Sequence, residues 1–206
     1  MLELLMIRHG RTKGNTEKRY IGTTDEPLLA SERARLGTKQ EDLKEMGMLR
    51  PDVLLVSPMK RCVETEEILF PEADPVVVPD FRECDFGAFE NKNYQELDGN
   101  ADYQRWIDSG GRLPFPGGES MQSFQERVCR AFRREISELA LRSERRGKPD
   151  GKVAMVVHGG TIMAALERYG FPRKSYYDWH VENGDGFLLS VRETGDDLRL
   201  CVRCGF

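Results

Sequence analysis

Short runs of apolar residues recur along the chain, each followed at once by polar residues. The clearest are residues 2–7, 53–56 and 153–157, and Val76–Val78 is a shorter one. Strands that are buried on both faces of a parallel sheet have this continuous pattern, whereas half-exposed strands alternate apolar and polar positions. Residues 2–7 are too few to span a membrane, and Glu3 interrupts them. The pattern therefore predicts a buried and mostly parallel sheet.

Segments with helical periodicity separate the predicted strands. The longest opens at Glu119-Ser120, and its apolar residues recur at every third or fourth position, as on the buried face of a helix: Phe124, Val128, Phe132, Ile136 and Leu139. We interpret the many arginines and glutamates elsewhere on this helix as a solvated face. Gly147–Gly151 is expected to end the helix and turn the chain.

Capping signals place two further helices, and a third is predicted after His158-Gly159. Ser31 is the expected N-cap of the first, and Gly47 is placed to end it. Ser57-Pro58 is typical of a helix start, with serine at the N-cap and proline at the first helical position. The chain closes with a predicted hairpin that turns across Gly195. The predicted ranges are 31–46, 57–69 and 162–169 for the helices, and 187–191 with 198–202 for the hairpin.

Alternation of strands and helices predicts an α/β fold. We expect one domain of 206 residues, with a three-layer, doubly wound, mostly parallel sheet and helices on both faces. Lys13–Pro27 is predicted to be a loop. Residues 80–118 are irregular, and the prolines and glycines of Leu113–Gly118 exclude a helix or a central strand there. We expect residues 80–118 to form an inserted lobe over the carboxyl edge of the sheet, where it can act as a lid.

Composition narrows the classes of function. The formal net charge of −4 argues against a nucleic-acid partner, so an anionic substrate needs a local basic pocket. The five cysteines are sparse and odd in number, which is typical of a reduced protein. Cys201 and Cys204 have CxxC spacing but no second ligand pair, which favours a structural role. The sequence contains no signal peptide, membrane span or lipidation motif, so we expect a cytoplasmic location and no membrane partner.

Polar residues at the ends of the predicted strands carry the candidate chemistry. Arg8-His9-Gly10 ends the first strand, Arg61 follows the second, and His158-Gly159 ends the fourth. If these strands simply ended in solvent, the polar residues that follow them would have no functional role. The carboxyl ends of parallel strands nevertheless meet at the edge where open α/β sheets bind ligands. Two imidazoles and two guanidinium groups would there form a compact cationic pocket.

Two carboxylates, Glu83 and Asp85, alternate with apolar residues and would share one side of an extended segment. Together with the cationic pocket they fit phosphoryl transfer without a metal. Arginines can neutralise the phosphoryl oxygens, an imidazole can attack, and a carboxylic acid can protonate the departing alkoxide. A metal hydrolase fits less well, because the chain has three histidines and no HExxH motif. We interpret His180 as a packing or surface residue.

These motifs, in this order, resemble the histidine phosphatase superfamily with its phosphoglycerate-mutase-like fold. The resemblance extends over nearly the whole chain. Residues 20–28 and 116–120 further resemble the bacterial branch that includes alpha-ribazole phosphatase. The motifs that carry the resemblance are Arg8-His9-Gly10 with Thr12 and Asn15, Ser57-Pro58 with Arg61, Glu83 before Asp85-Phe86-Gly87, and His158-Gly159.

The resemblance implies a phosphomonoester hydrolase that needs no cofactor and no metal. His9 would be the nucleophile, with its attacking nitrogen unprotonated and its other N–H held by a carbonyl or carboxylate. Glu83 would be the general acid and then the base, with a raised pKa, and Asp85 is the competing candidate. His158 would be favoured as a cation. The implied phosphoryl-binding residues are Arg8, Arg61 and His158, with Asn15, Gly22, Thr23 and Gly159 completing the cradle.

The resemblance leaves several alternatives open. The implied partner is a small phosphorylated metabolite, with alpha-ribazole 5′-phosphate or a sugar phosphate as candidates, and the oligomeric state stays open. A cofactor-dependent phosphoglycerate mutase is the alternative among enzymes. A non-catalytic phosphate-binding regulatory domain is the alternative of another class. Arg11 departs from the glutamate common in relatives and would add positive charge at the mouth of the pocket.

Overall fold

The structure is a computed structural model that describes residues 2–145, 151–194 and 197–206. The strands are β1 (Leu2–Arg8), β2 (Val53–Val56), β3 (Pro75–Val77), β4 (Lys152–Val157), β5 (Gly170–Phe171), β6 (Gly186–Thr194) and β7 (Asp197–Gly205). In the described residues they form one seven-stranded sheet in the order β3-β2-β4-β1-β6-β7-β5. The predicted buried strands β1, β2 and β4 are confirmed, whereas Val76 and Val77 of β3 are about half exposed.

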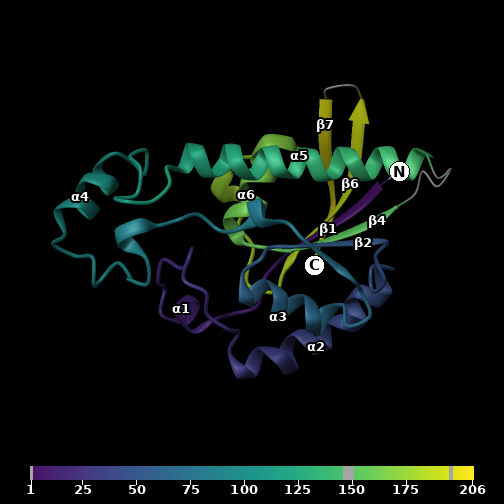
Figure 1. Ribbon diagram of the computed structural model, residues 1–206, viewed down its shortest axis with the longest axis horizontal. Helices are drawn as coiled ribbons and strands as arrows, with labels where there is room; N and C mark the ends of the chain where they lie inside the picture. Colours follow the sequence, from purple (N-terminus) through teal and green to yellow (C-terminus); the bar gives the residue numbers. More distant parts are fainter. Residues whose placement is uncertain (1, 146–150, 195–196) are drawn as a thin grey trace.

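Helices cover both faces of this sheet. The α-helices are α1 (Lys13–Thr16), α2 (Ala30–Glu45), α3 (Lys60–Leu69), α4 (Ala101–Asp108), α5 (Met121–Arg145) and α6 (Gly159–Tyr169). Single 3₁₀ turns are η1 (Pro79–Phe81), η2 (Gly87–Phe89) and η3 (Tyr176–Trp179). Figure 1 shows α2 and α3 on one side of the sheet and α5 and α6 on the other. The predicted three-layer α/β fold is confirmed.

The pairing of the central strands positions the candidate residues. Strand β4 runs parallel to both β1 and β2, with Arg8 opposite Val157 and Val56 opposite Val156. Strand β1 pairs on its other side with β6 in the antiparallel direction, so the sheet is mixed. The ladder continues past the strands, because the His9 N–H donates to the Val157 carbonyl over 2.9 Å. The chain therefore leaves these three strands at one edge of the sheet.

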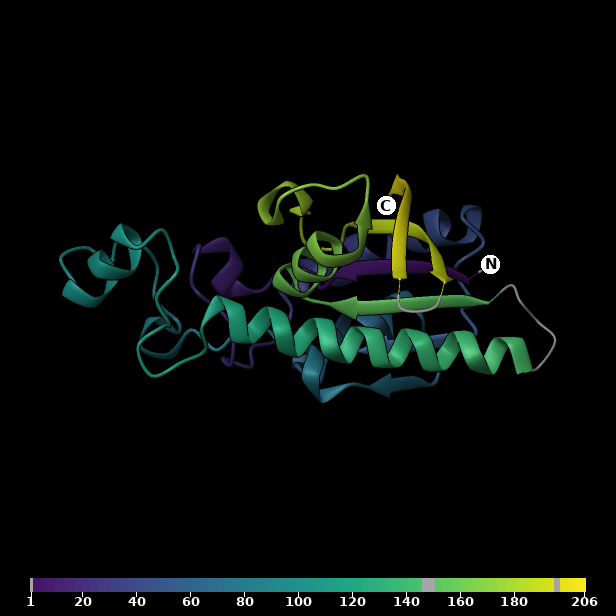
Figure 2. The same cartoon turned by 90° about the horizontal axis from the view of Figure 1, so that it is seen from above.

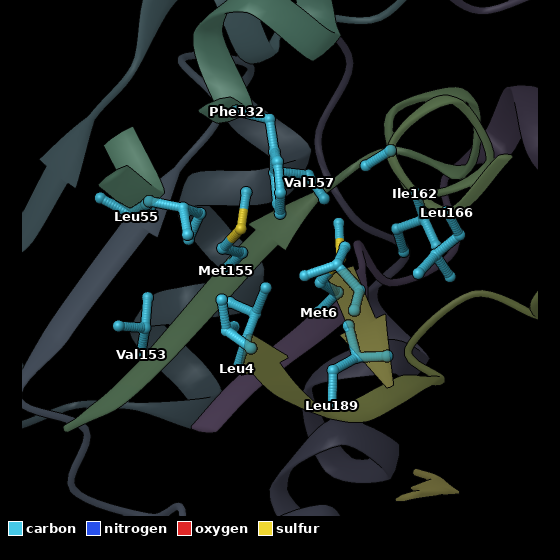
Figure 3. Close-up of a cluster of buried hydrophobic side chains, with 14 of the residues drawn as sticks. Leu4, Met6, Leu55, Phe132, Val153, Met155, Val157, Ile162, Leu166 and Leu189 are labelled. Carbon is cyan, nitrogen blue, oxygen red and sulfur yellow. The ribbon is translucent and has the colours of Figure 1, made fainter. Parts of the chain in front are cut away.

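Alternate residues of each central strand fill two separate cores. Leu4 and Met6 of β1 pack on one face with Phe132 of α5 and Leu166 of α6, and Figure 3 shows this cluster around the sheet. The neighbouring residues of β1, such as Leu5, pack on the opposite face with α2 and α3. Successive side chains of a strand point to opposite faces, so a buried strand must be apolar at every position. This explains the continuous runs.

Tertiary contacts move the start of α2 away from the predicted cap. The helix begins at Ala30, and Ser31 lies inside its first turn instead of capping it. Leu28 forms a bridge with Thr12, and the Leu29 N–H donates to the Arg11 carbonyl. These bonds hold the chain extended up to Leu29. The prediction of Ser31 as N-cap was therefore wrong, whereas Gly47 has the expected positive φ, of 67°.

Two other boundaries differ from the prediction. The region predicted as a loop from Lys13 contains the one-turn helix α1, which Thr12 and Asn15 close with a capping box. Helix α6 starts at Gly159, three residues earlier than expected. The predicted helix end at 147–151 and the hairpin turn at Gly195 fall on or across residues 146–150 and 195–196, outside the described residues.

The segment between β3 and α5 extends beyond the end of the sheet toward which β4 points, as Figure 2 shows. It contains η1, η2 and α4. A third apolar cluster joins it to the rest of the molecule, with Phe89 and Phe115 of the segment packed with Phe124 and Val128 of α5. This segment therefore faces the carboxyl ends of the central strands. Those ends carry the candidate residues.

The core contact of α5 predicts a large loss of stability on truncation. Phe132 is fully buried between α5 and the sheet. We expect Phe132→Ala to lower the free energy of unfolding by about 3–5 kcal/mol, because it removes buried apolar surface and leaves a cavity. Urea denaturation followed by circular dichroism measures the change. Leu141→Ala on the same helix is the control, since Leu141 is 53% exposed and should change stability by less than about 0.5 kcal/mol.

Candidate active site

Two histidines and two arginines come together at the carboxyl ends of β1, β2 and β4. His9 and His158 follow β1 and β4, and their ring centroids lie 5.2 Å apart with the rings edge to face. Arg8 is the last residue of β1, and Arg61 lies in the first turn of α3. Both histidines and Arg61 are buried. The predicted convergence of the strand ends is found in the structure.

Neither guanidinium group forms an ion pair with a carboxylate among the described residues. Arg61 donates to the carbonyls of Thr24 and Gly22, over 2.9 Å each. Arg8 donates to the Val181 carbonyl over 2.8 Å. The Nε atoms of both arginines are buried without a hydrogen-bond partner. Because a buried charge without a counter-ion is costly, this arrangement favours an anion between the two groups.

The surroundings of His9 select one tautomer. Its Nδ1 lies 2.7 Å from the Gly10 carbonyl oxygen, which can only accept, so Nδ1 carries the proton and Nε2 keeps its lone pair. Burial lowers the pKa of the His9 imidazole well below its ordinary value, and the guanidinium groups of Arg61 and Arg8 lower it further. The ring is therefore held neutral, with Nε2 able to act as a nucleophile.

His158 differs from the expectation that it is a cation. Burial lowers its pKa well below the ordinary value, and the charges of Arg61 and Arg8 act in the same direction. Its Nε2 lies 2.7 Å from the Ser57 hydroxyl, a neutral partner that adds no compensating charge. The imidazole is thus neutral in this arrangement. Ser57 contacts His158 instead of capping α3, which begins at Lys60, so the cap prediction for Ser57 was also wrong.

The Glu83 carboxylate lies at the amino end of α6. It accepts hydrogen bonds from the N–H groups of Gly160, over 3.2 Å, and of Cys84, over 3.0 Å. A β-carbon on Gly160 would collide with this carboxylate, so glycine permits the close approach. Burial raises the pKa of Glu83 above its ordinary value, and the hydrogen bond from Cys84 opposes the shift. The direction agrees with the expectation for a proton donor.

Asp85 does not share the position of Glu83. Its carboxylate accepts from the Gly87 N–H over 2.9 Å, within its own turn. The Glu83 side chain lines the cavity beside the strand ends, and Asp85 does not. The prediction that both carboxylates lie on one side of an extended segment was therefore wrong, because residues 82–86 form no strand.

The loop that follows α1 has two polar sides. Its N–H groups at Gly22 and Thr23 donate to the Glu90 carboxylate over 2.9–3.2 Å. Its carbonyls accept from Arg61, as described above. Gly22 and Thr23, which the resemblance places in the phosphoryl-binding cradle, therefore have their N–H groups bound by Glu90. The loop instead orients the Arg61 guanidinium, and Glu90 holds the loop.

Asn15 and Gly159 lie beside the histidines. The side-chain Oδ1 of Asn15 accepts from the side-chain N–H of Asn183, which also donates to the backbone carbonyl of His9 over 3.0 Å. Asn15 therefore supports the backbone at His9 from α1. Gly159 begins α6, and a β-carbon there would lie 3.3 Å from the Arg8 Nε. Its lack of a side chain keeps that nitrogen approachable.

A cavity of about 220 Å³ opens from this cluster toward the segment between β3 and α5. Arg8, Glu83 and Gly159 lie at its polar end, and aromatic and methionine side chains form most of its remaining wall. His180, interpreted from sequence as packing or surface, lies at this cavity with its Nε2 3.4 Å from Arg8 Nη1. Arg11 does not line the cavity and pairs with Glu32 over 3.0 Å, so it does not supply the charge expected at the mouth.

Several supporting residues were missed in the sequence. Arg127 was assigned to a solvated face, yet it donates to the backbone carbonyls of Asp80 and Arg82 and pairs with Glu119 over 2.6 Å. It thereby holds the backbone that carries Glu83. The spacing of this pair was the available signal, because Arg127 follows Glu119 by eight residues at the start of the predicted helix. Glu90 acts over a long separation in the sequence and gave no such signal, and Ser57 was interpreted as a helix cap although it binds His158.

The described residues contain no cluster of three metal-ligating side chains. All five cysteines are free, and Cys201 and Cys204 lie on β7, away from the histidine cluster. Within the part of the chain that the structure describes, no helix has the length and apolar character needed to cross a membrane.

Comparisons with known proteins agree with this geometry. The sequence model of the "Histidine phosphatase superfamily (branch 1)" matches residues 4–202. The probable phosphoglycerate mutase GpmB of Salmonella typhi is 31% identical over 138 residues, which is 64% of this chain. The match spans 62% of the length of that relative, less than two thirds.

Two solved structures share the fold. A putative alpha-ribazole-5′-P phosphatase from Escherichia coli K-12 superposes with a TM-score of 0.77 at 22% identity, covering 98% of this chain and 95% of the other. The phosphoglycerate mutase from Thermus thermophilus superposes with a TM-score of 0.69 at 27% identity, covering 99% and 98%. The whole described architecture is therefore common to these proteins.

The position of Glu90 predicts a loss of anion affinity when its carboxylate is removed. We expect Glu90→Ala to weaken binding of inorganic phosphate about tenfold or more, because the loop that orients Arg61 loses several charge-assisted hydrogen bonds. Isothermal titration calorimetry measures the dissociation constant. Asp102→Ala is the matched control on the same segment, since Asp102 pairs with Arg105 within α4. Equal affinity in both variants would contradict the role of Glu90.

Proposed function

The chain belongs to branch 1 of the histidine phosphatase superfamily, and from this premise we propose that it hydrolyses phosphomonoesters of small metabolites without a metal, through a phosphohistidine on His9. One observation carries the proposal. The bare Nε2 of a neutral His9 lies in a cluster with the buried guanidinium group of Arg61 and the partly buried one of Arg8, and neither has a carboxylate partner among the described residues. A phosphoryl group supplies the negative charge that this cluster lacks, and it presents an electrophile to His9.

In the first step, His9 Nε2 attacks phosphorus and a P–N bond forms. The bond from phosphorus to the ester oxygen breaks, and its electron pair leaves with the alcohol. Protonated Glu83 donates its proton to that oxygen, which makes the alkoxide a better leaving group. Arg8 and Arg61 bind the phosphoryl oxygens through donors that include their free Nε groups. His158 can gain a proton once the bound dianion offsets the guanidinium charges.

In the second step, a water molecule attacks the phosphorus of phosphohistidine. The Glu83 carboxylate accepts a proton from this water, the P–N bond breaks, and its electrons return to Nε2 of His9. Inorganic phosphate then leaves, and Glu83 is again protonated. The raised pKa of Glu83 favours both halves of this cycle, because the carboxyl holds its proton at a higher pH than an ordinary glutamic acid and can still release it.

Hydrolysis is favoured over the mutase reaction by the compact segment between β3 and α5. A mutase must retain the phosphorylated enzyme until a second alcohol accepts the phosphoryl group, and extra chain usually excludes water for that purpose. The solved relatives named above include both a putative alpha-ribazole-5′-P phosphatase and a phosphoglycerate mutase. Alpha-ribazole 5′-phosphate and sugar phosphates are the candidate substrates. A non-catalytic domain is disfavoured because both histidines and Glu83 are present and assembled.

The nucleophile assignment predicts complete loss of turnover without loss of the anion site. We expect His9→Ala to lower kcat for an aryl phosphate at least about 1,000-fold, while inorganic phosphate still binds through Arg8 and Arg61. Steady-state kinetics and calorimetry measure the two effects. Rapid quenching in base should trap a phosphorylated protein with wild type and none with His9→Ala. Retention of most activity in the variant would overturn the assignment.

The proton-donor assignment predicts a dependence on leaving group and on pH. Glu83→Gln should slow alkyl phosphates far more than nitrophenyl phosphate, whose leaving group needs no proton. Because the pKa of Glu83 is raised, its proton is present at low pH and lost as pH rises through that pKa. We therefore expect kcat/KM for alkyl phosphates to fall on the alkaline side in wild type, and this limb to disappear in Glu83→Gln. Equal losses for both ester classes would rule out proton donation.

A further inference from the structure

The cavity beside the candidate active site changes character along its length. Its polar end contains Arg8, which binds the phosphoryl group in the proposed function, and Glu83, which donates the proton to the leaving group. The rest of the wall comes from the loop after α1, the segment between β3 and α5, and the α6–η3 region: Tyr20, Phe86, Trp106, Phe115, Met163 and Tyr176. A leaving group attached to a phosphoryl at the polar end would lie against this wall.

The aromatic rings of the wall are fixed by contact with one another. Trp106 stacks on Phe115 with ring centroids 5.0 Å apart, and Phe86 meets Phe115 edge to face at the same distance. Tyr20 in turn meets Phe86 edge to face at 5.3 Å. Burial raises the pKa of the Tyr20 phenol above its ordinary range, so this ring stays neutral. The wall is a preformed set of flat surfaces that a planar ring can contact without reorganising it.

Charges are scarce on the same wall. Among the described lining residues, Arg8 is the cation and Glu83 the carboxylate, and both serve the phosphoryl group in the proposed mechanism. His180 also lines the cavity, with its Nε2 3.4 Å from Arg8 Nη1. The nearby Arg127 is engaged by Glu119. A carboxylate or second phosphate on the leaving group would therefore lose its water without gaining a cation.

From these observations we propose that the substrate is a monophosphate ester whose alcohol carries an uncharged planar ring, and that an acidic ester such as a phosphoglycerate is excluded by the wall. This inference rests on the proposed function for the position of the phosphoryl group. The cavity, of about 220 Å³, has room for such a ring.

The test compares esters whose alcohols have similar basicity, so that binding of the leaving group decides the result. They are 2-phenylethyl phosphate, butyl phosphate and 3-phosphoglycerate. We expect kcat/KM for 2-phenylethyl phosphate to exceed that for 3-phosphoglycerate by about 10-fold to 100-fold, the range that burial of one ring implies. A value for 3-phosphoglycerate equal to or above that for 2-phenylethyl phosphate overturns the inference.

Matching phosphonates separate this inference from the proposed function, because they cannot be hydrolysed. Dissociation constants of 3-phenylpropylphosphonate, pentylphosphonate and 2-hydroxy-4-phosphonobutanoate are measured by calorimetry. The ring compound should bind about tenfold or more tightly than the carboxylate compound, whether or not the protein turns over any ester. If this order of affinities is found but no ester is hydrolysed, the proposed hydrolase activity is refuted and the proposed preference of the cavity wall for an uncharged ring is supported. If the carboxylate compound binds more tightly than the ring compound, the proposed preference for an uncharged ring is refuted and the proposed hydrolase activity is unaffected.

Two variants localise the preference to the wall. Trp106→Ala should lower the ratio of kcat/KM for 2-phenylethyl phosphate to that for butyl phosphate about tenfold, whereas Leu113→Ala should leave the ratio unchanged. Leu113 is 46% exposed on the same segment and does not line the cavity. Tyr177 lies at the cavity and is 75% exposed, so Tyr177→Arg should fold and should raise kcat/KM for 3-phosphoglycerate. An unchanged ratio in Trp106→Ala, or no gain in Tyr177→Arg, counts against the proposal.

Discussion

A buried guanidinium group without a carboxylate partner among the described residues is the constraint on which the site depends. The Arg61 side chain is completely buried, and its terminal nitrogens reach only backbone carbonyls of the loop after α1. That loop can face Arg61 with carbonyls because Glu90 binds its N–H groups from the other side. Burial lowers the pKa of both histidines, and the same positive charge lowers it further, so both rings stay neutral. An arriving dianion therefore relieves electrostatic strain at several groups together.

Much of the fold could be predicted because it depends on local periodicity. Strands buried on both faces must be apolar throughout, so β1, β2 and β4 were evident in the sequence. Helix starts failed where a side chain serves a distant partner. Ser57 binds the His158 ring, and Ser31 is overridden by the bridge between Thr12 and Leu28. A capping motif describes only its own turn, so it carries no information on such contacts.

The convergence of His9, Arg61 and His158 was predictable from topology, since parallel strands deliver their ends to one edge. The protonation states of the two histidines could not be predicted, because they depend on burial and on the charges that are buried beside the rings. His158 was expected as a cation and is neutral for this reason. The supporting residues were equally hidden, since Glu90 is 68 residues from Gly22 in the chain. The cavity wall is also assembled from separate segments, and only the folded chain brings its rings into contact.

The backbone bond between His9 and Val157 has a consequence for how mutations affect this molecule. It holds the backbone at His9 beside the end of β4 at the ordinary strand spacing of about 4.8 Å, a length that core side chains scarcely alter. Substitutions in the two cores can therefore lower the stability of the fold while the backbone at the edge with the two histidines keeps its geometry in each folded molecule. The stability of the fold and the geometry of the site can therefore change independently during evolution.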